Sequence, residues 1–278
     1  MRYIGLVGCL FFFSVKSVAG FLPNEERVPG GVALIELPEK YANGIQPKVS
    51  FQNESVALIR GESENKQAIW IAIVGVPLNS DVGTVELVIQ DKYPLKLPFQ
   101  IHSKKYPEEH LTFKNKKHVT PDPETLKRIT QESKHLKEVF SRWTTSTNFE
   151  PTLYVPAEGR NSHNFGKRRV INGEPRSPHK GIDIAAPIGT PVIAAQRGVV
   201  TDVGDYFYTG NTVVVDHGQG MQSIYCHLNS VEVQPQQKVS AKEQIGTVGK
   251  TGRATGPHLH FGVNLNNARV SPSLFFVN

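Results

Sequence analysis

Two histidines near the end of the chain stand at alternate positions of one short stretch, residues 256–263. If the stretch is extended, His258 and His260 share one face, because successive side chains of a strand point to opposite sides. The other face carries only apolar side chains, namely Leu259, Phe261 and Val263. That set is typical of a core face. The two imidazoles therefore stand side by side on the opposite face, where a metal ion or a reacting group can lie between them.

A second half-site lies upstream, in residues 179–184. Asp183 falls on one face of an expected strand, while the apolar Ile182 and Ile184 fall on the other and His179 heads the segment. A lone His-x-His is a weak sign of metal binding. Two half-sites, each on an amphipathic strand, are a much stronger one.

A third candidate group is His227, in the expected strand 221–228. Two imidazoles and the Asp183 carboxylate would make a nitrogen and oxygen site with a fourth position left for water, which is the pattern of catalytic zinc. A structural zinc site is normally closed, often by thiolates, and the sequence has only 2 cysteines. The two remaining imidazoles can then act as general acid and base. Five groups and one metal ion suffice for amide hydrolysis.

Three ordered motifs give the sequence a resemblance to a known family: His179-x-x-x-Asp183, Tyr225-x-His227-Leu228 and Thr255-Gly256-Pro257-His258-Leu259-His260-Phe261. Together they closely resemble the lysostaphin-type (LytM-like) zinc endopeptidases, which cut peptide bonds in bacterial peptidoglycan. The glycine turns between the motifs are also similar, including Asn164-Phe165-Gly166. The resemblance covers about residues 160–275.

The resemblance implies a compact, mostly antiparallel β fold with a narrow groove across the sheet. It further implies that His179, Asp183 and His260 bind Zn²⁺, while His227 and His258 assist catalysis. No expected position is missing, so we expect a zinc metalloendopeptidase that hydrolyses cross-links or stems of peptidoglycan. The alternative is a catalytically silent wall-binding or hydrolase-activating protein on the same fold.

Two questions about the substrate stay open. Arg253, in the glycine-rich loop beside the site, is a weak candidate for meeting a substrate carboxylate, and a plain surface arginine is an equal reading. The cleaved bond is either a D-alanyl to diamino-acid cross-link or a glycine bridge. The absence of a recognisable wall-targeting module of the Gram-positive kind favours the former.

The elements that must position these residues are mostly strands. Residues 28–105 contain short strand-like runs separated by turn clusters, which predicts a small β-sandwich, and the N-terminal domain is expected to span residues 21–118. No catalytic cluster occurs there, and His102 and His110 are expected to face solvent. The domain is expected either to restrain or to position the active site.

A connecting helix is expected within residues 119–145, capped by Asp122 and started by Pro123. One apolar stripe at helical spacing should pack it on a neighbouring domain: Leu126, Ile129, Leu136, Val139, Phe140 and Trp143. Residues 146–278 then form the antiparallel β catalytic domain. In its strand 221–228, Cys226 should be a small core residue that points away from His227.

The start of the chain reads as a secretory signal in residues 1–20: a basic start, an apolar run and a small-residue cleavage site. Retention as an anchor, or lipidation at Cys9, are alternatives. We expect an exported protein, periplasmic or bound to the cell envelope, with no transmembrane segment in the mature chain. The net charge of +6 suits an anionic polymer such as a cell wall, while no basic stripe interleaved with aromatics indicates nucleic-acid binding.

Overall fold

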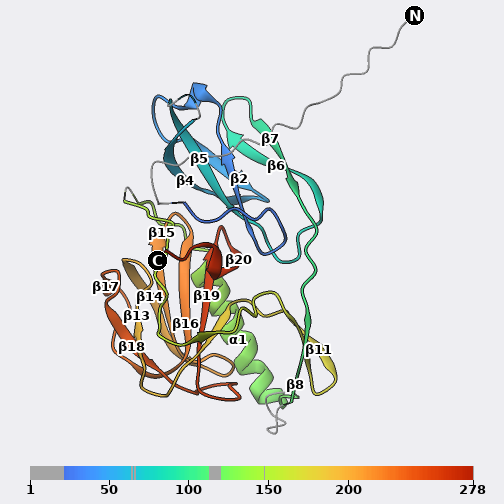
Figure 1. Cartoon of the computed structure of the whole chain (residues 1–278), viewed down its shortest axis with the longest axis vertical. Helices are drawn as coiled ribbons and strands as arrows, with labels where there is room; N and C mark the ends of the chain where they lie inside the picture. The colour runs from blue at the N-terminus through green and yellow to red at the C-terminus, as the bar shows by residue number, and fades with distance from the viewer. Residues whose placement is uncertain (1–21, 64, 66, 113–119, 147, 278) are drawn as a thin grey trace, which may run out of the picture.

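The computed structural model describes residues 22–63, 65, 67–112, 120–146 and 148–277 of the chain. The predicted signal segment, Cys9 included, lies outside the described residues. Figure 1 shows an N-terminal β domain, drawn in blue to cyan, above a C-terminal β domain, with one long helix beside the latter. The predicted fold class, mostly β with a connecting helix between two β domains, is confirmed. Within the described part of the chain, no helix is long and apolar enough to cross a membrane.

The N-terminal domain is the predicted sandwich, built from two antiparallel sheets. One sheet has the order β1–β5–β4 and the other the order β3–β2–β6–β7. The strands are β1 (Val32–Glu36), β2 (Lys48–Phe51), β3 (Glu54–Ser55), β4 (Ala57–Glu62), β5 (Ala68–Gly75), β6 (Gly83–Gln90) and β7 (Leu95–Ile101), with a short 3-10 turn η1 (Glu39–Tyr41). Trp70, Leu87 and Phe99 lie in the core between the sheets.

Strand β5 is buried on both faces, which explains its unbroken apolar sequence. Ala72 and Val74 point into the sandwich core, whereas Ile71 and Ile73 belong to the core of the C-terminal domain. The two β domains therefore pack through a continuous apolar interface. Polar contacts border it: the side chain of Asn266 bonds both the N–H and the carbonyl of Gly75, at 2.6 and 3.0 Å.

Helix α1 (Pro123–Phe140) begins as predicted, since the Asp122 side chain accepts a hydrogen bond of 2.8 Å from the N–H of Thr125. The predicted apolar stripe is only partly right. Val139 and Phe140 are buried against Val214, Ile224 and Cys226, but Leu126 is 48% exposed. Polar contacts join the earlier part of the helix to the domain instead: Arg128 Nη2 donates to the carbonyl of Asp205 over 3.0 Å, and Glu132 accepts a hydrogen bond of 2.9 Å from the N–H of Phe207.

The C-terminal domain is one 10-stranded sheet in which every pairing is antiparallel. Its main path is β17–β14–β15–β16–β19–β12–β9, with β13 and β18 paired to each other and β20 beside β19. The strands are β9 (Arg160–Asn161), β12 (Ile182–Ala185), β13 (Pro191–Ile193), β14 (Gly198–Tyr206), β15 (Gly210–Gly218), β16 (Met221–Val231), β17 (Lys238–Val239), β18 (Gln244–Val248), β19 (Leu259–Leu265) and β20 (Ala268–Val270); η3 (Pro272–Leu274) follows.

A fourth, small sheet joins the connector after the sandwich to the C-terminal domain. Strand β8 (Glu108–Leu111) pairs in parallel with β10 (Arg168–Ile171), which pairs in turn with β11 (Glu174–Arg176). Just before β8, the ring of Tyr106 packs on Phe165 with centroids 6.3 Å apart. The sequence patterns did not predict this sheet, whose strands are short and, apart from Ile171, half-buried or exposed.

Candidate metal centre

Strands β12 and β19 bring the two predicted half-sites together. They pair antiparallel with Asp183 directly opposite His260, so the two side chains share one face of the sheet. Their apolar neighbours are buried in the core behind, as the alternation predicts: Ile182, Ile184, Leu259, Phe261 and Val263. Burial of the apolar face fixes the pairing register of β12 and β19. A shift of one residue would move the apolar side chains out of the core and turn the side chains of the half-sites into it.

Three donor atoms of the site converge on one point. His179 Nε2 lies 2.8 Å from His260 Nδ1 and 3.2 Å from Asp183 Oδ1, and the last two atoms are 2.9 Å apart. Donors about 3.3 Å apart are expected around a tetrahedral ion with bonds of about 2.0 Å. The donor set of two imidazole nitrogens and one carboxylate oxygen thus fits a zinc ion in both chemistry and spacing.

Asn164 orients two of these three side chains. Its side-chain amide donates to Asp183 Oδ2 over 2.8 Å, which leaves Oδ1 turned toward the histidines. Its amide oxygen accepts from the N–H of Asp183 at 3.1 Å. Its backbone carbonyl lies 3.2 Å from Nδ1 of His179; a carbonyl can only accept, so Nδ1 carries the proton and Nε2 is left as the donor atom.

The electrostatics of the site keep the donors in the form that binds a cation. Burial lowers the pKa of His179 and lowers the pKa of His260 to about 4, although the neighbouring Asp183 opposes both shifts. Burial also works against ionisation of Asp183. Hydrogen bonds and charge from His179 and His260 outweigh that effect and hold the pKa of its carboxyl well below the usual range. The triad is thus a carboxylate with two neutral imidazoles at neutral pH.

The other two predicted histidines lie beside the triad and face each other. The rings of His227 and His258 are 4.7 Å apart at their centroids, and His258 Nε2 is 3.7 Å from Asp183 Oδ1. In each ring Nδ1 donates to a backbone carbonyl over 2.8 Å, to Thr251 from His227 and to Gly256 from His258. Nε2 is therefore the basic nitrogen of both neutral rings. Burial, followed by the charges of His260 and His258, lowers the pKa of His227 to about 3.

The backbone at His227 departs from strand alternation. We predicted that Cys226 points away from His227, and this is wrong: Tyr225 and Leu228 both enter the main core, while Cys226 lies opposite His260 on the site face. His227 has a left-handed φ of 64°, and the register of β16 shifts just after it. This bulge turns His227 toward His258. Cys226 is nevertheless a buried small core residue, as predicted.

The described histidines outside the site lie as their local sequence suggested. His102, His110 and His163 are exposed. His217 is buried and structural, with Nδ1 2.9 Å from the carbonyl of Arg197 and Nε2 2.8 Å from Ser223 Oγ. His135, on the helix, is partly exposed and pairs with the buried Asp202 at 2.7 Å.

Two residues at the site were not predicted from the sequence as functional groups: Asn164 and Arg169. Arg169 Nη2 lies 3.7 Å from Asp183 Oδ2, the same oxygen that Asn164 holds. Asn164 precedes a glycine turn and Arg169 sits on a short strand, so neither belongs to a periodic pattern. Arg253 lies in the loop between β18 and β19, with its guanidinium 4.1 Å from the ring centre of Tyr208.

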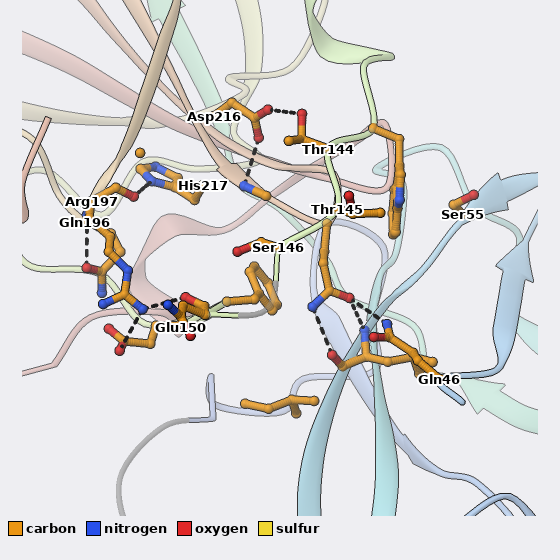
Figure 2. A pocket seen from close by; sticks show the side chains of 18 of the residues that line it. Gln46, Ser55, Thr144, Thr145, Ser146, Glu150, Gln196, Arg197, Asp216 and His217 are labelled. Carbon is orange, nitrogen blue, oxygen red and sulfur yellow. Dashed lines mark hydrogen bonds and ion pairs between the residues drawn. The ribbon is translucent and has the colours of Figure 1, made fainter. Parts of the chain in front are cut away.

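A pocket of about 1820 Å³ opens between the two β domains, away from the metal centre. Figure 2 shows Gln46 and Ser55 of the N-terminal domain at one side and Glu150, Arg197 and His217 at the other. Gln219 also lines it and joins the domains, since its side chain bonds the backbone of Leu58. None of the five predicted site residues is among the described residues that line this pocket.

Comparisons with known proteins match both β domains. The sequence profile of the peptidase family M23 matches residues 177–272, and that of the peptidase family M23 N-terminal domain matches residues 25–104. A crystal structure from Pseudomonas aeruginosa, named as a peptidase M23, is 36% identical, covers 90% of this chain and 95% of its own, and superposes with a TM-score of 0.73.

Two curated relatives are similar over less than half of the chain. The peptidoglycan DD-endopeptidase ShyA of Vibrio cholerae is 42% identical over 123 residues, 44% of this chain and 25% of its own length. The DD-carboxypeptidase/endopeptidase Mpg of Neisseria meningitidis is 42% identical over 125 residues, 45% of this chain and 28% of its own length. The matched segment thus spans about a quarter of each curated relative.

Proposed function

Because the chain belongs to peptidase family M23, we propose that it is a zinc-dependent endopeptidase that hydrolyses peptide bonds in peptidoglycan cross-links or stems. The observation that carries the proposal is the convergence of His179, Asp183 and His260 within hydrogen-bonding distance of one another. The names of the relatives ShyA and Mpg support the substrate class. Since peptidoglycan lies outside the cytoplasmic membrane, the proposal includes export to the periplasm or cell envelope.

In this proposal His179, Asp183 and His260 hold the zinc ion. A bound zinc ion supplies Lewis-acid chemistry, lowering the pKa of a water and polarising a peptide carbonyl. Asn164 keeps Asp183 Oδ1 and His179 Nε2 aimed at the ion, since it bonds the opposite atom of each side chain. These contacts pre-orient the ligands before the ion arrives.

His227 and His258 are the proposed acid–base pair. Each presents Nε2, because Nδ1 is fixed by a backbone carbonyl. A neutral Nε2 can accept a proton from the attacking water, and the protonated ring can return it to the leaving amine. Once charged, an imidazole beside the reacting carbonyl also stabilises the negative charge that grows on its oxygen. Either ring can take either role in the arrangement observed.

The proposal is tested by digesting purified sacculi with the zinc-loaded chain and identifying the released peptides by mass spectrometry. We expect new amino termini where a cross-link or stem bond was cut. His227→Ala should bind zinc yet release little, which separates catalysis from metal binding. If the zinc-loaded chain releases no fragment from several chemotypes of sacculi, the proposal is refuted and the non-enzymatic alternative takes its place.

We further propose that the N-terminal domain positions the site. Asn266 bonds the sandwich and directly follows the end of β19, whereas His260 lies near the start of that strand. At a rise of about 3.3 Å per residue, the two residues are about 20 Å apart, so this contact is far from the site. The connector instead touches the loop that carries Asn164, through Tyr106 and Phe165. Weakening this contact with Tyr106→Ala should reduce zinc affinity, which a titration measures. Unchanged affinity together with increased activity would favour restraint by the domain.

A further inference from the structure

The earlier part of helix α1 is tied by hydrogen bonds to one turn of the C-terminal domain. The Glu132 carboxylate accepts from the N–H of Phe207 over 2.9 Å, and Arg128 Nη2 donates to the carbonyl of Asp205 over 3.0 Å. Phe207 is the first residue of the turn between β14 and β15, which consists of residues 207–209. The helix therefore holds the β14–β15 turn by its backbone.

Glu132 uses both of its carboxylate oxygens in this contact. Oε2 accepts from the N–H of Phe207, and Oε1 accepts from Arg128 Nε over 2.6 Å. The Glu132 side chain is only 16% exposed, so water competes little for either bond. A charged acceptor also makes stronger hydrogen bonds than a neutral one. Glu132 thus fixes the start of the turn relative to the helix.

The other end of the turn bonds the backbone of His227. The carbonyl of Thr209, the last residue of the turn, accepts a hydrogen bond of 2.8 Å from the N–H of His227. Gly210 follows the turn and packs on Thr251 so closely that an added Cβ atom would clash with the Thr251 backbone. The carbonyl of Thr251 in turn accepts from Nδ1 of His227. Both backbone acceptors of His227 therefore belong to the turn or pack next to it.

His227 needs such support because of its backbone conformation. Its φ of 64° lies in the left-handed region, where a residue with a side chain persists only if the surrounding structure fixes it. The regular ladder is also interrupted here, since the pairing of β15 with β16 shifts register between Asn211 and Val213. The direction of the His227 ring thus depends on contacts from outside its own strand, and the β14–β15 turn supplies one of them.

The turn has little apolar packing to keep it in place. Its residues are half-buried, and in the described part of the chain no apolar core cluster includes Phe207 or Tyr208. Segments with few buried apolar contacts open at a low cost in free energy. Loss of the Glu132 carboxylate should therefore let the turn move, and the carbonyl that accepts from the N–H of His227 would move with it.

We propose that Glu132 is a positioning residue for His227. Its carboxylate fixes the β14–β15 turn, and the turn keeps the His227 ring next to the metal centre with Nε2 able to exchange a proton. The proposal rests on the proposed function, in which His227 is an acid–base group. It adds the connecting helix to the parts of the chain that this activity requires.

Steady-state hydrolysis of a cross-linked muropeptide by the zinc-loaded full chain tests the proposal. Glu132→Ala should lower kcat by about 10- to 100-fold, a loss expected for a misplaced reacting group, with KM and zinc affinity unchanged. Glu132→Gln should recover most of this kcat, because its amide oxygen can still accept from the N–H of Phe207. An unchanged kcat in Glu132→Ala, or equal losses in the two variants, overturns the proposal.

Glu138→Ala is the matched control, because Glu138 is an exposed glutamate on the same helix. Its kcat should equal that of the unmodified chain. If Glu138→Ala loses as much kcat as Glu132→Ala, the effect belongs to the helix as a whole and the proposal is overturned.

The tautomer of the His227 ring gives a second measurement. Nitrogen NMR of the zinc-loaded chain with labelled histidines distinguishes the two neutral tautomers, and the signals absent from His227→Ala are those of His227. We expect the Nδ1–H form alone in the unmodified chain and a mixture of both forms in Glu132→Ala. A lower unfolding midpoint with an unchanged tautomer would mean a purely structural role and overturn the proposal. Because NMR needs no turnover, an unmodified chain that cleaves nothing counts against the proposed function alone.

Discussion

Replacing Asn164 with alanine tests whether the metal centre is pre-oriented by its neighbours. The Asn164 side chain is 4% exposed and makes two hydrogen bonds to Asp183, one of them to the charged carboxylate. A hydrogen bond to a charged group contributes about 1.5–3 kcal/mol. The backbone carbonyl that orients His179 survives the substitution. We therefore expect Asn164→Ala to weaken zinc binding by about 10- to 100-fold, the range typical of outer-shell substitutions.

The assay is a competition between the chain and a chromophoric chelator of known zinc affinity. Asn161→Ala is the control, because Asn161 has the same side chain in the same segment but, among the described residues, its side chain bonds only the N–H of His163, at 2.9 Å. The reasoning is refuted if Asn164→Ala binds zinc as tightly as the unmodified chain. It is equally refuted if Asn161→Ala loses as much affinity, since the effect would then not pass through Asp183.

Four further predictions concern single residues. His227→Ala should lower kcat by about 100- to 10,000-fold with zinc affinity retained, and a parallel loss of zinc in the titration would contradict its role as an unligated acid–base group. Phe261→Ala should cost about 3–5 kcal/mol in denaturant unfolding, because the ring is fully buried against Tyr225; a loss under about 1 kcal/mol would contradict this packing. Burial raises the pKa of Cys226 to about 12, so thiol reagents at pH 8 should label it only after unfolding. Burial lowers the pKa of His217, so folding favours its neutral ring; its contribution should leave stability unchanged above about pH 7 and reduce it as the pH falls through about 6.5, where the unfolded chain gains the proton. Chemical unfolding at pH 7.5 and 5.5 measures that change, which His217→Gln should diminish.

Sequence alternation predicted the site where a strand is buried on one side only. In β12 and β19 the apolar residues mark the core face. The alternation of side chains along each strand therefore suffices to place Asp183 and His260 on the opposite face. The same argument failed at His227, because this residue has a left-handed conformation and forms a bulge. The extra residue of the bulge shifts the alternation of side chains by one position. Nothing in the side-chain pattern of residues 223–228 signals that backbone conformation, since His227 is not a glycine.

Helix α1 shows a second limit of periodicity. The stripe of apolar residues predicted a helix buried along its length, but only its last turns bury apolar side chains against the sheet, and Leu126 remains exposed. The spacing of apolar residues predicts which face of a helix can be buried. It does not predict how much of that face a neighbouring element covers. Contacts such as Glu132 with the N–H of Phe207 join residues far apart in sequence, so no local pattern predicts them.

The parallel pairing of β8 with β10 has a consequence for how this chain can be divided. The residue register sets Glu109 opposite Arg169, and Tyr106 fills the space above Gly166, where an added Cβ atom would clash with its ring. The domain that carries His227 and His258 is thus completed by strand β8, which precedes it in the chain. A fusion protein that contains only the residues after the helix would lack β8 and leave β10, which carries Arg169, with an unpaired edge. The substrate preference of such a protein should therefore not be taken as that of the intact chain.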